Sequence, residues 1–394
     1  MPITLFLDYL RNSLEKKEFS IALFLDLSKA FDTVNHEILL QKLNFYGIRD
    51  KALDWFKSYL CNRKQFVFYN NAKSELATIN CGVPQGSILG PTLFILYIND
   101  IVSSSKVLNF FIFADDTNIL NSHKNLQDLT NITNNELKTI SDWMAANKLS
   151  LNIGKTKYIL FSPRGKYNKR QNLNSLILIR NKPLDKVESA DFLGVTIDDQ
   201  LNWKNHVNKI KMKISRVLGV LYKTRHKLNT TAMKSIYYAL IQSHINYCIL
   251  NWGSANKTIL MPLQILQNKF VRILTNNNSR THAPPLFKEN KILHIFDVYK
   301  VNVLKFVWCC LNRPANFPKD IFKEFFKRNS QIHRYNTTRR NELHPCNFKN
   351  DYGKKSLKNQ GRVVWNETPH KIQNSLSLSQ LKSESIKHFI KNYM

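Results

Sequence analysis

The sequence predicts an α+β fold over the first 200 residues, followed by a helical and strongly basic second half. Up to residue 200, short apolar segments of strand length alternate with amphipathic segments of helical spacing. Beyond that point, apolar residues recur with helical periodicity over 205–250 and 257–275. A chain of 394 residues has room for about two or three domains. We expect domains over 1–200, 201–325 and 326–394, the last with low apolar content and partly disordered.

The elements follow from apolar runs and from the residues that interrupt them. IALFLDL at 21–27 has the length of a buried strand, and a helical pattern over 36–47 stops at Gly47. An apolar run, two acidic residues and a second apolar run over 107–120 predict a hairpin with carboxylates at its tip. Further predicted elements are an amphipathic helix on positions 3, 6, 7, 10 and 14, a helix at 51–60, two strands within 65–80, a Gly/Pro loop at 81–91, helices at 93–101 and 125–147, a strand within 151–161, an exposed basic loop at 162–174 and short strands within 177–198.

The charge is distributed unevenly along the chain. Lys and Arg number 58 and Asp and Glu 28, which gives a net charge of +30 at pH 7. Residues 1–200 hold 24 basic and 20 acidic residues, whereas residues 201–394 hold 34 and 8. A solvated basic surface would explain a modest excess. An excess of this size favours a polyanionic partner, most simply nucleic acid.

Composition also bears on where the protein acts. Six cysteines scattered through the chain favour a reducing compartment over a disulfide framework. The sequence has no apolar run of about 18 residues, so we expect no membrane-spanning helix. Asp8 interrupts the N-terminal apolar stretch and no basic residue precedes it, which argues against a signal peptide. We expect an intracellular protein of the nucleus or cytoplasm that is neither secreted nor bound to a membrane.

Three aspartates stand where a lone charge is unfavourable. Asp26 follows an apolar strand-like run, and Asp115 and Asp116 are neighbours within an apolar hairpin. Adjacent carboxylates repel each other, and a divalent cation would relieve that repulsion. If the strand ending at Asp26 lies beside the hairpin, the three carboxylates form the ligand set of a pair of Mg²⁺ ions. The alternative is two exposed turn aspartates and one helix N-cap.

Three motifs occur in order and at close spacing around these aspartates. They are FLDLSKAFDTV at 24–34, GVPQGSILGP at 82–91 and FADDT at 113–117. They resemble motifs A, B and C in the palm of a reverse transcriptase of the jockey-like, non-long-terminal-repeat retrotransposons. NKLSLNIGKTKYILF at 147–161 and FLGVTID at 192–198 resemble motifs D and E. Group II intron maturases and telomerase-like polymerases share this palm, but motifs A and B favour the retrotransposon type.

The resemblance implies a fold and a reaction. The fold is a palm, an antiparallel sheet with helices packed on one face, followed by an all-helical thumb and a basic C-terminal region. The reaction is RNA-directed DNA polymerisation, in which two Mg²⁺ ions, with Mn²⁺ as an alternative, transfer a nucleotide from a dNTP to a primer 3′-hydroxyl. Asp26, Asp115 and Asp116 match the catalytic, metal-binding aspartates, and the backbone carbonyl of Leu27 matches a further metal ligand.

Other positions of the family pattern carry implied roles at the nucleotide. Phe31 matches the bulky side chain that excludes a 2′-hydroxyl, although a core phenylalanine would look the same. Gln85 and Gly86 match the pair that lines the nucleotide and template pocket. Lys155 lies near the position of the motif D lysine that protonates pyrophosphate, and Lys157 is the alternative residue for that role.

The implied nucleic-acid contacts lie later in the chain. Phe192, Leu193 and Gly194 fall at the primer grip. The family's thumb holds an RNA template and a DNA primer through their phosphates. The alternative is that each of these basic residues simply lies on a solvated helix surface. The residues implied to contact the backbone are Lys209, Lys211, Lys213, Arg216, Lys223 and Arg225.

One departure from the family pattern leaves two functions open. Family members carry a fingers region before motif A, whereas only 25 residues precede Asp26 here. We therefore expect a chain that is truncated at its N-terminus and lacks most of the fingers. The first function is an active reverse transcriptase. The second is a catalytically inactive remnant that only binds nucleic acid. The sequence predicts no oligomeric state.

Overall fold

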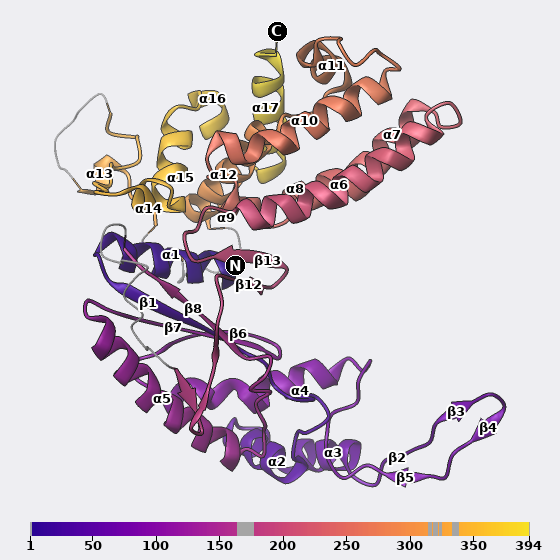
Figure 1. Cartoon of the computed structure of the whole chain (residues 1–394), viewed down its shortest axis with the longest axis vertical. Helices are drawn as coiled ribbons and strands as arrows, with labels where there is room; N and C mark the ends of the chain where they lie inside the picture. Colours follow the sequence, from indigo (N-terminus) through magenta and orange to yellow (C-terminus); the bar gives the residue numbers. More distant parts are fainter. Residues whose placement is uncertain are drawn as a thin grey trace. The chain divides into compact units, whose positions relative to one another are not determined.

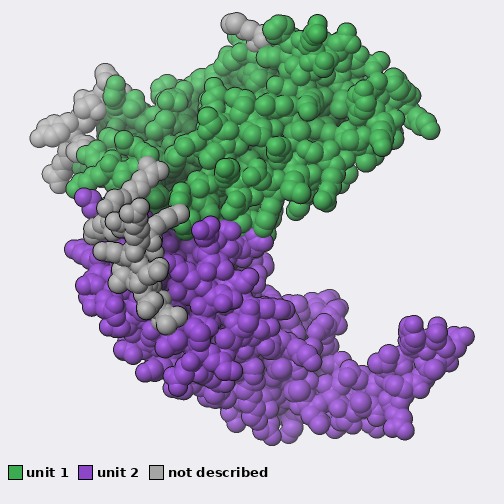
Figure 2. All heavy atoms as spheres, viewed as in Figure 1, with its two compact units in different colours: residues 1, 3–15, 194–394 green, residues 2, 16–193 purple. Residues whose placement is uncertain are grey.

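The computed structural model describes residues 2–163, 177–313, 317, 322, 325–332 and 339–393. The chain divides into two compact units (Figure 2). We call residues 2 and 16–193 the sheet unit, and residues 1, 3–15 and 194–394 the helical unit. The predicted basic loop at 162–174 lies outside the described residues, apart from its first two positions.

A five-stranded sheet in the order β11-β8-β1-β7-β6 organises the sheet unit. Its central strand β1 is buried along its whole length and runs antiparallel to both neighbours, β7 and β8. The strand bounds are β1 (Phe19–Leu25), β6 (Asn109–Phe113), β7 (Asp116–His123), β8 (Lys157–Phe161) and β11 (Asp185–Lys186).

The edge of this sheet differs from the prediction. Strand β11 pairs with β8 in parallel, so the sheet is mixed and the predicted wholly antiparallel sheet is wrong at this edge. Parallel neighbours require a long crossover between them. The chain between residues 161 and 185 is long enough to return to the starting end of β8. The broader prediction, an α+β unit followed by a largely helical part, is confirmed.

Helices cover one face of the sheet and form its core. They are α2 (His36–Phe45), α3 (Asp50–Leu60), α4 (Leu89–Ile98) and α5 (Leu126–Ala146). Alternate residues of β1, namely Ile21, Leu23 and Leu25, join the buried cluster that these helices complete. Strand side chains alternate between faces, so one face of β1 supplies one side of this core.

Local signals explain several element boundaries. The side chain of Asn35 caps α2 by accepting a hydrogen bond from the Ile38 amide, and α2 ends just before Gly47, which has a φ of +94°. The predicted strands at 65–80 form an exposed arm of two short hairpin segments, β2 (Lys64–Gln65) with β5 (Ala77–Thr78) and β3 (Phe68–Tyr69) with β4 (Ala72–Lys73) (Figure 1). Its tip residues Asn70 and Asn71 both have positive φ, as a type I′ turn requires.

The helical unit contains the N-terminal helix α1 (Pro2–Glu15) from Ile3 onward. Arg11 bonds this helix to two other segments of the helical unit. Its buried guanidinium donates to the carbonyls of Lys355, at 2.7 Å, and Asn251, at 3.3 Å. Burial lowers the pKa of Arg11 to about 10. A buried cation is tolerated because backbone carbonyls replace its hydration.

Long helices make up most of the helical unit. Helix α12 buries ten of its 18 residues and contacts both α15 and α17. The Trp308 indole donates to the Ser375 carbonyl at 3.0 Å. In the described part of the last segment, Trp365 and Leu381 are buried, and residues 333–338 lie outside that part. The main bounds are α6 (Lys204–Thr224), α7 (Thr230–Ile236), the π-helical η2 (Tyr237–Gln242), α8 (Ser243–Asn246), α10 (Lys257–Leu274), α11 (Ala283–Asn290), α12 (Ile295–Asn312), α15 (Leu357–Asn366) and α17 (Leu378–Lys391).

No helix among the described residues combines the length and apolar character that crossing a bilayer requires.

Candidate active site

Strand register brings the three aspartates to one end of the sheet. Leu25, the last residue of β1, pairs with Thr117, so the next residue along β1 is Asp26 and the preceding residue on β7 is Asp116. Phe113 pairs with Asp116 across the β6–β7 hairpin, which leaves Ala114 and Asp115 in a two-residue turn. The three aspartates therefore lie at the same end of the paired strands β1 and β7.

The turn that holds Asp115 is strained. Ala114 has a φ of +52°, a left-handed conformation that costs a residue with a Cβ about 1–2 kcal/mol. Positive φ at the first turn position alone matches a type II′ hairpin, where glycine is usual. Backbone strain of this kind clusters at functional sites, and here it places one carboxylate at the tip and the next at the start of β7.

The three carboxylates interact electrostatically. The pKa of Asp116 is raised above its ordinary value, first because the carboxyl is partly desolvated and then because Asp115 and Asp26 are close enough to repel its charge. The repulsion destabilises the ionised form of Asp116. A cation near the three side chains would stabilise that ionised form. The effect relates the end of β1 to the β6–β7 hairpin.

The donor set suits a hard divalent cation, although the side chains do not form a closed cage. Carboxylate and carbonyl oxygens are the ligands that Mg²⁺ and Mn²⁺ prefer. In the part of the chain that the structure describes, no group of three or more His, Cys, Asp or Glu side chains is placed to hold a metal ion. The residues therefore fit a metal site by chemistry, charge and register, and not by a preformed cluster.

The backbone of Leu27 is oriented by its neighbours. Leu27 pairs with Leu151 between two hydrogen bonds, one from the Ser28 amide to the Ser150 carbonyl and one from the Asn152 amide to the Asp26 carbonyl, both of 2.8 Å. A residue between two such bonds directs its own N–H and C=O to the opposite side. That opposite side is the one on which β7 pairs with β1, so the Leu27 carbonyl points toward the hairpin that carries Asp115.

Two loops from motifs A and B are bonded to each other. The Val83 amide donates to the Phe31 carbonyl at 2.8 Å, and the Gly82 amide donates to the Val34 carbonyl at 2.7 Å. Gly82 has a φ of +87°, and a Cβ there would lie 2.8 Å from the Asp32 carbonyl oxygen. Only glycine fits at this position. Sequence reasoning singled out Gly86 and missed Gly82, although both lie in the same motif.

The nucleotide-pocket residues lie on these loops. Phe31 is half-buried, and its ring centroid is 4.7 Å from that of Phe94, so it also packs against the core. The Gln85 side chain donates to the Asp32 carboxylate at 2.7 Å. Gly86 has a φ of +79° with open space where a Cβ would stand.

A cavity of about 640 Å³ lies beside Gln85. Its walls come from the motif A and B loops and from the base of the exposed arm, and they include the cationic side chains of Lys29 and Arg63. Sequence reasoning missed Arg63, because nothing in the local pattern relates the arm to the motif B loop.

The predicted residues of motifs D and E lie on several different elements. Lys155 is exposed in the turn that begins at Asn152, and Lys157 is exposed on β8 opposite Phe24. Phe192 is buried in the sheet unit with its ring 6.5 Å from that of Phe24. Leu193 and Gly194 both have positive φ and stand at the division between the two units.

The basic residues predicted to contact nucleic acid lie on α6 in the helical unit. One face of this helix, with Val207, Ile210, Ile214, Leu218 and Leu221, is buried, whereas its lysines and Arg216 are exposed. Arg225, just beyond the helix, lies 4.1 Å above the ring of Tyr222. An arginine stacked on an exposed aromatic ring presents both charge and a flat surface to a ligand.

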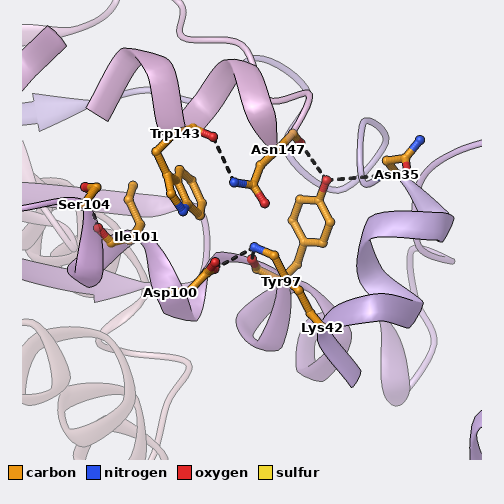
Figure 3. A network of polar contacts seen from close by, with 8 residues as sticks. All are labelled: Asn35, Lys42, Tyr97, Asp100, Ile101, Ser104, Trp143 and Asn147. Atoms are coloured by element: carbon orange, nitrogen blue, oxygen red, sulfur yellow. Dashed lines mark hydrogen bonds and ion pairs between the residues drawn. The ribbon is translucent and has the colours of Figure 1, made fainter. Parts of the chain in front are cut away.

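A partly buried polar network joins helices of the sheet unit (Figure 3). Lys42 donates to the Asp100 carboxylate and to the Tyr97 carbonyl, both at 2.6 Å. The Tyr97 hydroxyl donates to the Asn147 carbonyl at 2.6 Å and accepts from the Asn35 amide at 3.4 Å. The network thus joins α2, which follows motif A, α4, which begins within motif B, and the end of α5, which leads into motif D. Its members are far apart in sequence, and sequence reasoning missed them.

Comparison with known families agrees with the motifs. Residues 4–197 match the family model described as "Reverse transcriptase (RNA-dependent DNA polymerase)". The chain is 26% identical over 296 residues to the probable RNA-directed DNA polymerase from transposon X-element of Drosophila melanogaster. It is 29% identical over 271 residues to the RNA-directed DNA polymerase from mobile element jockey of the same species.

These matches cover most of this chain and a smaller part of the relatives. The X-element match covers 72% of this chain and 31% of the relative, and the jockey match covers 66% and 29%. The chain therefore spans about 30% of the length of these curated relatives. Among solved structures, apo telomerase from Candida tropicalis matches with a TM-score of 0.38 and 14% identity, covering 82% of this chain and 56% of that chain.

Proposed function

Because the chain belongs to the reverse transcriptase family, among those of non-long-terminal-repeat retrotransposons, we propose that it is an RNA-directed DNA polymerase. In this proposal the sheet unit is the palm and the helical unit contains the thumb. The observation that carries the proposal is the strand register that puts Asp26, Asp115 and Asp116 at the common end of β1 and the β6–β7 hairpin.

The metal ligands in this proposal are the carboxylates of Asp26, Asp115 and Asp116 and the carbonyl of Leu27. Bound Mg²⁺ or Mn²⁺ would supply charge neutralisation at the triphosphate and a lower pKa for the primer 3′-hydroxyl. Asp26 lies one position past the Leu25–Thr117 pair, beside Asp116 in the strand register, and would be the carboxylate that serves both ions. The mutual repulsion that raises the pKa of Asp116 favours cation binding.

The loops beside the carboxylates position the nucleotide in this proposal. Phe31 would crowd a 2′-hydroxyl and so select dNTPs over rNTPs. Gln85 and Gly86 would contact the base pair, since the open space at Gly86 lets a ligand approach the backbone closely. Lys155 would donate a proton to the leaving pyrophosphate. Positioning of this kind supplies a large part of the rate in phosphoryl transfer.

The RNA template and DNA primer would bind through phosphate contacts. The exposed basic face of α6 supplies Lys209, Lys211, Lys213, Arg216 and Lys223, with Arg225 just beyond it. Phe192, Leu193 and Gly194 would contact the primer end. Binding through these side chains should weaken steeply as salt is added, because bound cations are released from the phosphates.

A second function is favoured by one specific observation. The described residues include no closely placed group of metal-binding side chains, whereas the basic face of α6 is fully formed. A protein that binds nucleic acid without catalysing transfer would show these two features. Only an activity measurement separates this function from polymerisation, because both predict salt-sensitive binding.

Primer extension on poly(rA)/oligo(dT) with dTTP and Mg²⁺ tests the proposal. We expect extension by the unaltered chain and its loss, by a factor of at least about 100, in Asp115→Asn. Asp128→Asn is the matched control, because Asp128 is an exposed aspartate of α5 that pairs only loosely with His123 at 3.8 Å. No extension by the unaltered chain, with binding of the template retained, would favour the second function.

A further inference from the structure

A second cationic cavity lies entirely within the helical unit and outside α6. It has a volume of about 190 Å³ and is lined by residues of η2, α8, the turn after α11, α12 and α17. Helix α12 contacts both α8 and α17. Three lysines, Lys291, Lys305 and Lys382, stand in its wall. No Asp or Glu is among the described residues that line it. We call it the lysine pocket.

Lys305 is the unusual member of this set. It is half-buried on α12, and within the described part of the chain its ammonium group makes neither an ion pair nor a hydrogen bond. Burial lowers its pKa, and the nearby charge of Lys382 lowers it further. A half-buried cation facing another cation is unfavourable unless an anion compensates it.

The carboxylates on the neighbouring helices do not provide this compensation. Asp297 is the acidic residue of α12, and it accepts a hydrogen bond of 2.7 Å from the Tyr393 hydroxyl. Glu384 is the acidic residue of α17, and it pairs with Lys371 and Lys387, each at 3.2 Å. Both acidic side chains are already engaged away from Lys305, so the lysine pocket keeps its positive charge.

The rest of the wall is uncharged and combines aliphatic side chains, such as Ile292 and Val301, with polar and aromatic ones. Tyr238 is half-exposed, and it lies on η2, where the helix widens from α to π geometry. Such widened turns are frequent at functional sites, because they displace side chains from a regular helical surface. Asn246 and Asn302 line the same cavity and add amide groups. The lysine pocket therefore combines uncompensated cations, amides and an accessible ring.

We propose that the lysine pocket binds a phosphate group of a nucleic-acid backbone. Lys305 and Lys382 would contact the phosphate oxygens, and the Tyr238 ring would contact the adjacent sugar or base. A nucleic acid is a better match than a small anion, because the aromatic surface beside the cations suits a base and residues 201–394 carry 34 basic against 8 acidic residues. The contact would be separate from α6 and from the aspartates of the sheet unit.

The test measures binding of a fluorescent RNA–DNA hybrid by anisotropy, without divalent metal or dNTP, from about 50 to 200 mM NaCl. Lys305→Met should weaken binding about tenfold, because it removes one charged hydrogen bond to phosphate, and should make the salt dependence shallower by about one unit. Lys382→Gln should act in the same direction. Asp128→Asn, an exposed change on α5, should bind like the unaltered protein. Because the assay contains neither metal nor dNTP, a failure of the polymerase proposal leaves this result unaffected.

Lys300→Met is the matched control for charge. Lys300 lies on the same helix, but it lines a different cavity with Asp297 and Glu367, and its ammonium lies 5.6 Å from the Phe389 ring. It should change hybrid affinity by less than about twofold. If Lys305→Met and Lys300→Met weaken binding equally, the pocket contributes only general charge and the proposal is wrong.

Thermal unfolding with inorganic phosphate distinguishes a pocket that binds the phosphate of a nucleic-acid backbone from one that binds a free anion. Lys305→Met should not lower the melting temperature without ligand, because it removes a half-buried, uncompensated charge. Phosphate should raise the melting temperature of the unaltered protein and of Lys300→Met, but not of Lys305→Met. Loss of this phosphate effect without any loss of hybrid affinity would mean that the pocket holds a free anion, and would overturn the proposal.

Discussion

The backbone amide of Asn152 donates a hydrogen bond of 2.8 Å to the carbonyl of Asp26. These residues are far apart in sequence, and the bond ties the turn that carries Lys155 to the end of β1. The buried side chain of Thr156 reinforces the same junction, because its hydroxyl accepts from the Asp26 amide at 3.2 Å. The position of the Asp26 carboxylate thus depends on motif D as well as on motif A.

Thr156→Val should weaken this junction. Valine has the shape of threonine but cannot accept a hydrogen bond, so the Asp26 amide would lose its partner at a cost of about 1–3 kcal/mol. Urea unfolding should show this loss, and primer extension should fall with it. Thr156→Ser keeps the hydroxyl and should restore most of the activity. Equal activity in the Val and Ser variants would contradict a positioning role for this bond.

The raised pKa of Asp116 predicts a pH-dependent stability. Since the folded state holds the proton more tightly than the unfolded chain, stability is lost as pH rises from the ordinary value of 3.8 through the folded pKa. Asp116→Asn should therefore be more stable than the unaltered protein at pH 7, and this difference should vanish in acid. Urea unfolding across this range checks the sign.

The same repulsion can be measured at one carboxyl group. Asp115→Asn removes one neighbouring charge and should move the pKa of Asp116 toward its ordinary value, as followed by carboxyl carbon NMR. Asp128→Asn should leave that titration unchanged. An unchanged pKa in Asp115→Asn would show that the two carboxylates do not interact.

Gly82→Ala should separate the motif A and B loops. The added Cβ would lie 2.8 Å from the Asp32 carbonyl oxygen, and the backbone φ of +87° disfavours alanine as well. We expect a loss of about 1–3 kcal/mol in the free energy of unfolding. Gly154→Ala is the control within the same unit, since its Cβ would make an ordinary contact of 3.7 Å with the Asn152 side chain. A similar small effect in both variants would rule out the proposed close approach.

The pair of Lys42 and Asp100 should show energetic coupling. Lys42 is 13% exposed and Asp100 is 38% exposed, so solvent screens the 2.6 Å contact in part. A double-mutant cycle with Lys42→Met and Asp100→Asn should give a coupling of about 1 kcal/mol. Lys42→Met should cost more than Asp100→Asn, because it also removes the bond to the Tyr97 carbonyl. Additive effects would mean that the pair contributes nothing as a unit.

Sequence patterns predicted the elements that depend on local chemistry. The apolar run before Asp26 predicted β1, and the residues around Asp115 predicted the β6–β7 hairpin, since both patterns lie within about a dozen residues. The Asn70-Asn71 turn was predictable for the same reason, because asparagine tolerates positive φ. Positions that repeat along one helix face likewise predicted α6.

Features that depend on distant contacts were not predictable in this way. The parallel pairing of β11, the contact between Lys42 and Asp100, and the meeting of Lys305 with Lys382 each join segments separated by many residues. A single sequence carries no signal for such pairs, because periodicity identifies a buried face and not the partner that covers it. The π-helical turn at η2 was missed because its composition is that of an ordinary helix.

Binding of Mn²⁺, followed by electron paramagnetic resonance, tests most directly whether Asp26, Asp115 and Asp116 hold divalent cations. The full chain would be loaded with a primer–template that ends in a dideoxynucleotide and with dTTP, so that no transfer occurs. We predict protein-dependent Mn²⁺ binding that is lost in Asp26→Asn and Asp115→Asn and kept in Asp128→Asn. Equal Mn²⁺ binding by all four proteins would contradict a metal site at the end of β1 and the β6–β7 hairpin.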